Sequence, residues 1–293
     1  MKYTLIAFLF LWNLALTAQE NDSLKSSLLW EIKGKNIESP SYLLGTMHMM
    51  PEEDFFFPEH LKEKLLSTEL LLMEIESIDD GSNAGRYMYL DTGNVFNLFT
   101  ENQLDSLFDF TERELNYNEA KIRMIFSNMK PFILMQLLLQ SSFGENPASY
   151  EITLSKIASD HRIKIKGLET MEKQASLFDE ISLEDQVNML MKTLRKQEEA
   201  LAKGINSADE LIEVFLQQDI DSIFNYTISD GSDITILEQE FLTNRNIEWV
   251  KKIRKLIKRN SCFIAVGAAH LGGSKGVVQL LRNEGYELIP IKL

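Results

Sequence analysis

The sequence predicts an α/β fold with a split central sheet, mixed but mostly parallel, and a large helical insertion between the two parts of the sheet. Two observations predict this class. An apolar strand that ends in Gly-x-x-His occurs twice, at 41–48 and at 262–270, and each copy is followed by a helix and a second strand. Helical patterns fill most of the chain between the copies. Because parallel strands need a crossover such as a helix, the two βαβ-like repeats predict a mostly parallel sheet built from both ends of the chain.

The first eighteen residues have the pattern of a secretory signal peptide. Lys2 precedes an apolar run over 5–16, and residues 16–18 form a cleavage site of the small-residue type before Gln19. The run is short for a membrane span, and polar residues follow it directly. We expect cleavage, export to the periplasm or outside the cell, and no stable membrane span after cleavage. An uncleaved N-terminal anchor is the alternative.

Composition limits what the remaining residues, 19–293, can be. This length is sufficient for one large domain. Cys262 is the single cysteine, so no intrachain disulfide can form. The formal net charge of −14 argues against a nucleic acid partner, because phosphate binding needs a basic surface. We therefore expect one domain that is stabilised by packing, and the oligomeric state stays open.

The first repeat lies within residues 28–80. Its leading strands, at 28–32 and 42–44, flank a turn and predict a hairpin at the front edge of the sheet. A helix follows at 58–66, and the almost wholly apolar strand 70–75 is typical of a parallel strand covered on both faces. The second repeat has the same order, with a strand at 263–266, a helix at 275–283 and a strand at 287–291.

Helices are predicted for most of the chain between the repeats. Their ranges are 102–115, 118–127, 131–142, 150–160, 183–202, 207–217 and 234–258. An extended segment at 163–169 interrupts them and is expected to join the same sheet. The α/β core is therefore expected at about 28–80, 161–170 and 260–293, with the helical insertion at about 95–258.

Two of the four histidines, His48 and His270, close the repeated motif. A lone histidine at a strand end is usually a structural or surface group. Two at equivalent positions favour a functional pair, because open α/β sheets present ligand-binding groups at the carboxyl ends of their strands. Gly45 and Gly267 begin the two motifs, and we expect them to let the backbone turn and to leave room beside the imidazoles.

Acidic residues end the other predicted strands. Glu74 directly follows four apolar residues, so its carboxylate is expected to need a partner, whereas Glu76 suits a solvent-facing position. Glu169 ends the middle strand. Two imidazoles with one or two carboxylates form a ligand set for Zn²⁺, Mn²⁺, Fe²⁺ or Co²⁺, and a spare Glu would act as a general base. Arg245 is expected either to pair with a site carboxylate or to lie on the surface.

Two other functions stay open at this point. Met49, Met50 and the aromatic residues at 55–57 favour a non-catalytic protein that binds haem or a peptide in the same cleft. A hydrolase without a metal would use His48 as its base, with a Glu partner, and would be insensitive to chelators.

A series of short motifs runs through nearly the whole mature chain. They are Trp30, 42–48 (YLLGTMH), Met73-Glu74, Lys130-Pro131, 167–170 (GLET) with Gln174, Arg245-Asn246, 266–272 (VGAAHLG) and Gly285-Tyr286. In this order they resemble the motifs of the TraB/GumN family, whose animal members are the Tiki proteins. The resemblance implies an α/β fold shared with a ChaN-like haem-binding group and with erythromycin esterase-like enzymes.

The resemblance also implies a metal-dependent protease built on two Gly-x-x-His motifs and a Glu. His48, His270 and Glu74 would then be the metal or catalytic residues, with Glu169 and Arg245 in supporting roles. The cofactor would be a divalent metal ion (Mn, Co, Zn or Fe), and the substrate a peptide or a protein. We therefore expect an exported metal-dependent hydrolase, in particular a Tiki-like metallopeptidase.

Overall fold

The computed structural model describes residues 26–34, 36–76, 83–229 and 237–293. The predicted signal peptide, residues 1–18, lies outside the described residues. Among the helices that are described, none is long and apolar enough to cross a membrane.

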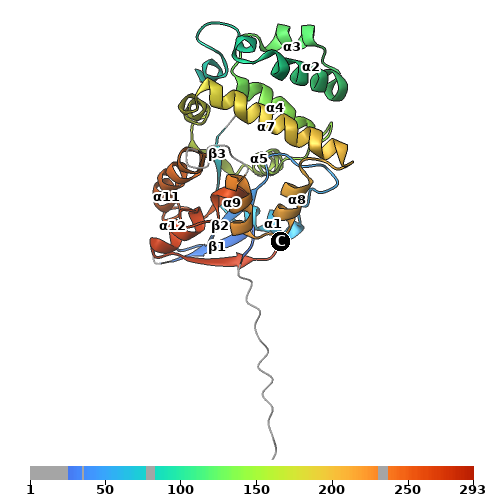
Figure 1. Cartoon of the computed structure of the whole chain (residues 1–293). Helices are drawn as coiled ribbons and strands as arrows, with labels where there is room; N and C mark the ends of the chain where they lie inside the picture. Colours follow the sequence, from blue (N-terminus) through green and yellow to red (C-terminus); the bar gives the residue numbers. More distant parts are fainter. Residues whose placement is uncertain (1–25, 35, 77–82, 230–236) are drawn as a thin grey trace, which may run out of the picture.

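A six-stranded sheet with the order β4-β3-β5-β2-β1-β6 forms the core (Figure 1). Its strands are β1 (Leu29–Lys33), β2 (Ser41–Thr46), β3 (Leu70–Ile75), β4 (Lys164–Glu169), β5 (Cys262–Gly267) and β6 (Glu287–Ile291). Neighbouring strands are parallel except at β1, which is antiparallel to both β2 and β6. The predicted α/β class with a mixed, mostly parallel sheet is confirmed.

The strand order interleaves the two repeats. Strand β5 of the second repeat lies between β2 and β3 of the first, and β6 pairs with β1 at the far edge. The predicted hairpin of β1 and β2 forms, but its edge position is wrong, because β6 covers the other side of β1. The apolar sequences of β3 (LLLMEI) and β5 (CFIAVG) suit strands with both faces covered. As a result, β2, β5 and β3 end side by side.

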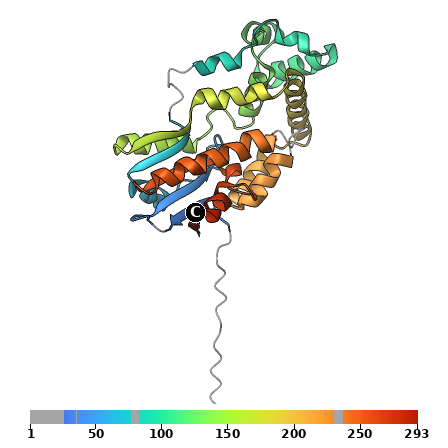
Figure 2. The ribbon, with the colours of Figure 1, turned by 90° about the vertical axis from the view of Figure 1, so that its left-hand side faces the viewer.

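Helices cover both faces of the sheet. One face packs against α1 (Glu59–Leu66), α5 (Tyr150–Asp160) and α8 (Asp209–Leu216). The other face packs against α11 (Asn244–Leu256) and α12 (Val277–Asn283). Figure 1 shows α11 and α12 on one side of the strands and α1 and α8 on the other, and Figure 2 shows α11 lying along the sheet. The helical insertion therefore supplies part of the cover of the α/β core.

The rest of the insertion forms a helical layer with its own apolar core. Its elements are η2 (Val95–Leu98), α2 (Glu101–Leu115), α3 (Glu119–Phe126), α4 (Pro131–Ser141) and α7 (Leu183–Ala202). Local signals set their limits: Thr100 and Gln103 form a capping box at α2, and Pro131 occupies the first turn of α4. In Figures 1 and 2 this layer lies at the end of the molecule away from β1.

The predicted helices are found with small shifts, and two more are present. Helices α5 and α7 have the predicted limits, whereas α6 (Met171–Ser176) and α9 (Ile220–Ser229) were not predicted. The helix predicted at 234–258 is divided. A π-helical segment, η4 (Leu237–Thr243), leads into α11, and residues 234–236 lie outside the described part of the chain. Segments of π-helix occur frequently at functional sites.

Candidate functional site

Three neighbouring strands bring the predicted residues together. In the register of the sheet, Thr46 of β2 lies opposite Gly267 of β5, and Met73 of β3 lies opposite Ala265 of β5. His48, Glu74 and His270 therefore follow or end strands that finish at the same edge. This is the edge at which open α/β sheets bind ligands.

Gly267 lies where these side chains converge. A β-carbon built on Gly267 would stand 3.4 Å from Glu74 Oε1, 3.6 Å from His270 Cδ2 and 3.7 Å from His48 Nε2. Gly267 therefore lies beside both imidazoles, and a β-carbon here would make ordinary contacts with them. We call the space that this β-carbon would fill the hollow at Gly267, and His48, Glu74 and His270 border it.

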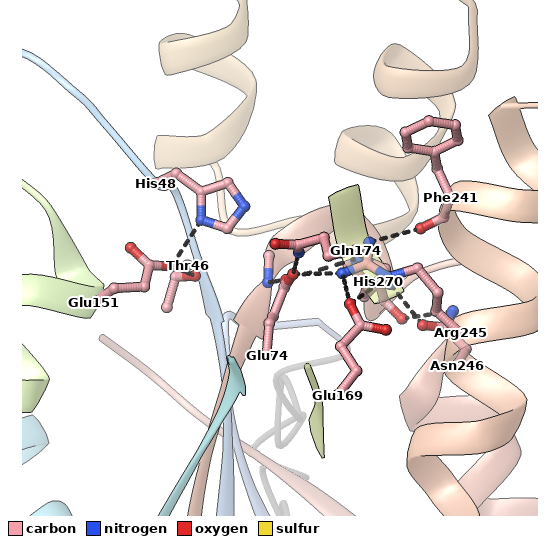
Figure 3. Close-up of polar contacts among 11 residues, drawn as sticks. Thr46, His48, Glu74, Glu151, Glu169, Gln174, Phe241, Arg245, Asn246 and His270 are labelled. Atoms are coloured by element: carbon pink, nitrogen blue, oxygen red, sulfur yellow. Dashed lines mark hydrogen bonds and ion pairs between the residues drawn. The ribbon is translucent and has the colours of Figure 1, made fainter. Parts of the chain in front are cut away.

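His270 is a buried, neutral imidazole, 4% exposed. Its Nδ1 lies 2.6 Å from Asn246 Oδ1, and Arg245 Nη1 lies 3.1 Å from its Nε2 (Figure 3). Burial lowers the pKa of His270 to about 3, and the charge of Arg245 acts in the same direction against the opposing field of Glu74. Since Asn246 Nδ2 donates to the carbonyl oxygens of His270 and Lys275, its Oδ1 is the acceptor for the Nδ1 proton.

Glu74 is a buried carboxylate with a donor on each oxygen. Its Oε1 accepts from the backbone nitrogen of Gly267 at 2.8 Å, and its Oε2 accepts from Arg245 Nη2 at 2.6 Å and from Gln174 Nε2 at 2.8 Å. Burial would raise its pKa, but the charge of Arg245 and the hydrogen bond from the Gly267 backbone outweigh burial and lower the pKa to about 2. Glu74 is therefore ionised at neutral pH, as its sequence position led us to expect of a buried carboxylate with a partner.

Arg245 joins Glu74 to Glu169. From the first turn of α11 its Nε and Nη2 donate to Glu169 Oε1 at 2.9 and 2.6 Å, and its Nη1 donates to the carbonyl oxygen of Phe241 at 2.9 Å. Both Arg245 and Glu169 are buried, so of the two positions expected for Arg245, pairing with site carboxylates is the one found. Glu169 Oε2 is buried and has no hydrogen-bond partner among the described residues.

His48 stands at the open side of the site, with its side chain 62% exposed. Its Nδ1 lies 2.9 Å from Glu151 Oε1, which also accepts from Thr46 Oγ1 at 2.6 Å. Figure 3 shows the imidazole apart from the buried cluster, with Glu151 behind it. Loss of hydration lowers the pKa of His48, but the hydrogen bond and the charge of Glu151 outweigh that effect and raise the pKa to about 9.

Some residues of the site were missed at the sequence level. Asn246 and Gln174 lie in the motifs that carry the family resemblance, but the chemistry of the sequence assigned them no role. Glu151 had no signal beyond its place near a helix start, where acidic residues are common. Conversely, Met50 is fully buried and the rings of residues 55–57 pack around Tyr150, so these residues line the core.

The donor types fit a divalent metal ion. Each imidazole has Nδ1 beside an acceptor, which leaves Nε2 as the ligand atom, and Glu74 supplies an ionised oxygen. In the side-chain arrangement of the described residues, however, no three His, Cys, Asp or Glu form a group that could hold a metal. At His270, Arg245 Nη1 lies 3.1 Å from Nε2, the atom that would bind the metal. A metal bound to His270 would require that guanidinium to move.

Comparisons with known proteins place the chain among relatives. It is 23% identical to metalloprotease TIKI2 of Danio rerio, 24% to a metalloprotease TIKI homolog of Amphimedon queenslandica and 22% to metalloprotease TIKI1 of Homo sapiens. These matches cover 90%, 92% and 90% of this chain but 60%, 62% and 61% of the relatives, so the chain spans less than two thirds of their length. No solved structure matches it. The profile of the TraB/PrgY/gumN family matches residues 28–290, and the chain therefore belongs to the TraB/PrgY/gumN family.

Proposed function

We propose that this protein is a metal-dependent hydrolase that acts on peptides or proteins, as the name of its Tiki relatives suggests. The observation that carries the proposal is the convergence of His48 Nε2, Glu74 Oε1 and the His270 ring around Gly267. Two imidazoles and one ionised carboxylate, supplied by three strands, are a ligand set of the hydrolytic type once His48 gives up its proton.

The residues of the site then have distinct roles. His48, His270 and Glu74 would hold the divalent ion (Mn, Co, Zn or Fe), which when bound supplies Lewis acidity to a water molecule or a peptide carbonyl. Arg245 keeps Glu74 in place, and all five of its N–H groups are occupied by acceptors. Glu169 is too deeply buried to reach a substrate, so we assign it to holding Arg245.

A hydrolase without a metal is a second candidate, favoured by a different observation. Arg245 supplies a positive charge between Glu74 and Glu169 and lies on His270 Nε2. In this case the accessible pair of His48 and Glu151 would transfer protons. The two candidates differ in their response to chelators.

Metal analysis and a cleavage assay decide between them. Zinc, manganese, cobalt and iron are measured in the protein and in the double variant His48→Ala/His270→Ala, with His60→Ala/His161→Ala as the matched control that removes the other two histidines. We expect about one metal per chain and cleavage of a peptide library in the protein and the control, and neither in the site variant.

Two outcomes would count against the proposal. Equal, substoichiometric metal in all three proteins would reject metal binding by these histidines. Peptide cleavage that persists in the presence of a chelator but is lost in His48→Ala would establish the metal-free hydrolase instead.

We further propose export and a single-domain organisation. Residues 1–18 would be removed as a signal peptide, and residues 19–293 would form one domain with the arrangement of ChaN-like and erythromycin esterase-like proteins. N-terminal sequencing of the protein recovered from the cell envelope should begin at Gln19, and an intact N-terminus would support an uncleaved anchor.

A further inference from the structure

Glu151 is a half-buried carboxylate that faces the site from the start of α5. Its Oε1 accepts from His48 Nδ1 at 2.9 Å and from Thr46 Oγ1 at 2.6 Å, and its Oε2 accepts from Ser149 Oγ at 3.1 Å. The Glu151 carboxylate therefore accepts hydrogen bonds from Thr46 and His48 in one segment and from Ser149 in another.

Glu151 is not needed to cap its helix. Ser149 is the N-cap residue of α5, and its side chain already accepts from the backbone nitrogen of Ile152. A structural capping role therefore does not account for the position of the Glu151 side chain toward His48.

The backbone around this contact is fixed from both sides. Met50, two residues after His48, exchanges two backbone hydrogen bonds with Ala148, three residues before Glu151, at 3.1 and 2.9 Å. The loop after β2 and the start of α5 are thus joined as a short antiparallel bridge. This bridge sets the distance between the imidazole and the carboxylate.

The contact between Glu151 and His48 determines which ring nitrogen of a neutral His48 carries the proton. Both oxygens of Glu151 accept from hydroxyl groups, Oε1 from Thr46 and Oε2 from Ser149, so the side chain acts as the acceptor toward His48 Nδ1. The proton of the neutral His48 ring must then lie on Nδ1, which leaves the lone pair of Nε2 facing the hollow at Gly267. Asn246 holds His270 by the same nitrogen.

We propose that Glu151 is a positioning residue that holds the His48 ring with Nε2 directed at the site formed with Glu74 and His270. This inference rests on the proposed function. It adds Glu151, which is not among the motifs quoted in the sequence analysis, and places it behind the exposed His48. An acceptor behind a metal-binding histidine typically contributes about 10- to 100-fold to metal affinity.

The test compares three variants of the full chain. Glu151→Ala removes the acceptor, and Glu151→Gln keeps an acceptor oxygen without the charge. Glu119→Ala is the matched control, because Glu119 also lies in the first turn of its helix but pairs with the exposed Arg123. Circular dichroism confirms that each variant is folded.

Two measurements are made on each variant. Nitrogen-15 spectra of the imidazoles, recorded through a pH titration up to the plateau at which His48 is neutral, report which ring nitrogen carries the proton. The signals are assigned with single variants of the four histidines. Titration with Zn²⁺ alone gives the affinity.

The expected result is a proton on Nδ1 of His48 in the protein, in Glu151→Gln and in Glu119→Ala, and on Nε2 in Glu151→Ala. Zinc affinity should fall about 10- to 100-fold in Glu151→Ala, recover in large part in Glu151→Gln, and stay unchanged in Glu119→Ala.

Unchanged zinc affinity and an unchanged His48 spectrum in Glu151→Ala would overturn the positioning role. Absence of zinc binding by the unaltered protein would instead reject the proposed function, while the spectra would still decide whether Glu151 sets the His48 proton.

Discussion

At the scale of single residues, Arg245 holds the candidate site together. Its five N–H groups reach Glu169, Glu74, the carbonyl oxygen of Phe241 and His270 Nε2. A planar guanidinium can serve these acceptors at once, whereas the ammonium of a lysine has three donors on a single nitrogen. Two buried carboxylates at this strand edge therefore depend on one cation.

Replacement of Arg245 by alanine should destabilise the whole protein. The change leaves Glu74 and Glu169 buried without their shared charge, and breaking a buried pair in this way costs about 3–5 kcal/mol. Urea unfolding measures the loss. Arg86→Ala is the control, because Arg86 pairs with Glu172 on the surface and exposed pairs contribute about 0–1 kcal/mol. Equal, small effects of the two substitutions would contradict this account.

The sequence predicted His48, Glu74, Glu169, Arg245 and His270 as site residues, and the structure brings these five into one region. Each stands at or near the end of a strand or within an ordered motif, so local pattern was enough to select it.

Glu151 could not be selected in this way. It lies 103 residues from His48, and it resembles the first-turn glutamates of α2 and α3 in its sequence surroundings. Its partner is determined by where α5 lies on the sheet, which is a tertiary property.

At the scale of the elements, the two Gly-x-x-His segments are equivalent in sequence but not in environment. A β-carbon on Gly45 would lie 3.0 Å from the α-carbon of Ala268 and 3.0 Å from Leu271 Cδ2, so Gly45 allows β2 to approach the turn after β5. Gly267 faces the site instead. Gly267 therefore lies beside the imidazoles, whereas the nearest atoms to a β-carbon on Gly45 belong to Ala268 and Leu271.

Alanine at these two positions should separate folding from function. Gly45→Ala forces the turn at Ala268 to move and is expected to cost about 1–3 kcal/mol in urea unfolding. Gly267→Ala places a methyl at ordinary contact distances, with backbone angles (φ −52, ψ 136) that alanine accepts, so the free energy of unfolding should change little.

The effect of Gly267→Ala on function should be large. A methyl between His48, Glu74 and His270 displaces whatever these groups hold, and misplacement of this size can lower a catalytic rate about 100-fold. Peptide cleavage and zinc titration measure it. A Gly267→Ala variant that is fully active but unstable would contradict the assignment of the hollow.

The order of the strands was the part of the fold that sequence did not reveal. Apolar runs, a turn between two short strands and the alternating segment at 163–169 identified all six strands, because strands and turns have local signals. Which strands become neighbours depends on the packing of helices over both faces, and β5 enters between β2 and β3 from the far end of the chain. That one insertion brings His270 between His48 and Glu74.

At the scale of the whole molecule, the apolar core is divided into three clusters. Two lie on the faces of the sheet, and the third joins η2, α2, α3, α4 and α7 in the helical layer. The site residues come from the sheet and from the helices that cover it. The helical layer can therefore open locally while the strands that hold the site stay protected, since local stability follows the packing of each cooperative unit.

A pair of core substitutions tests this division by amide hydrogen exchange. Ile122 is fully buried in the helical layer, and Ile264 is fully buried in β5. Truncation of either to alanine removes the same atoms and is expected to cost about 2–5 kcal/mol within its own cluster.

Ile122→Ala should speed exchange in α2, α3, α4 and α7 and leave β2 and β5 unchanged. Ile264→Ala should speed exchange in the strands and weaken zinc binding, which Ile122→Ala leaves intact. If Ile122→Ala accelerated exchange in β2 and β5 as much as in α2 and α3, the layer and the sheet would unfold as one unit, and the helical layer could not move independently of the site.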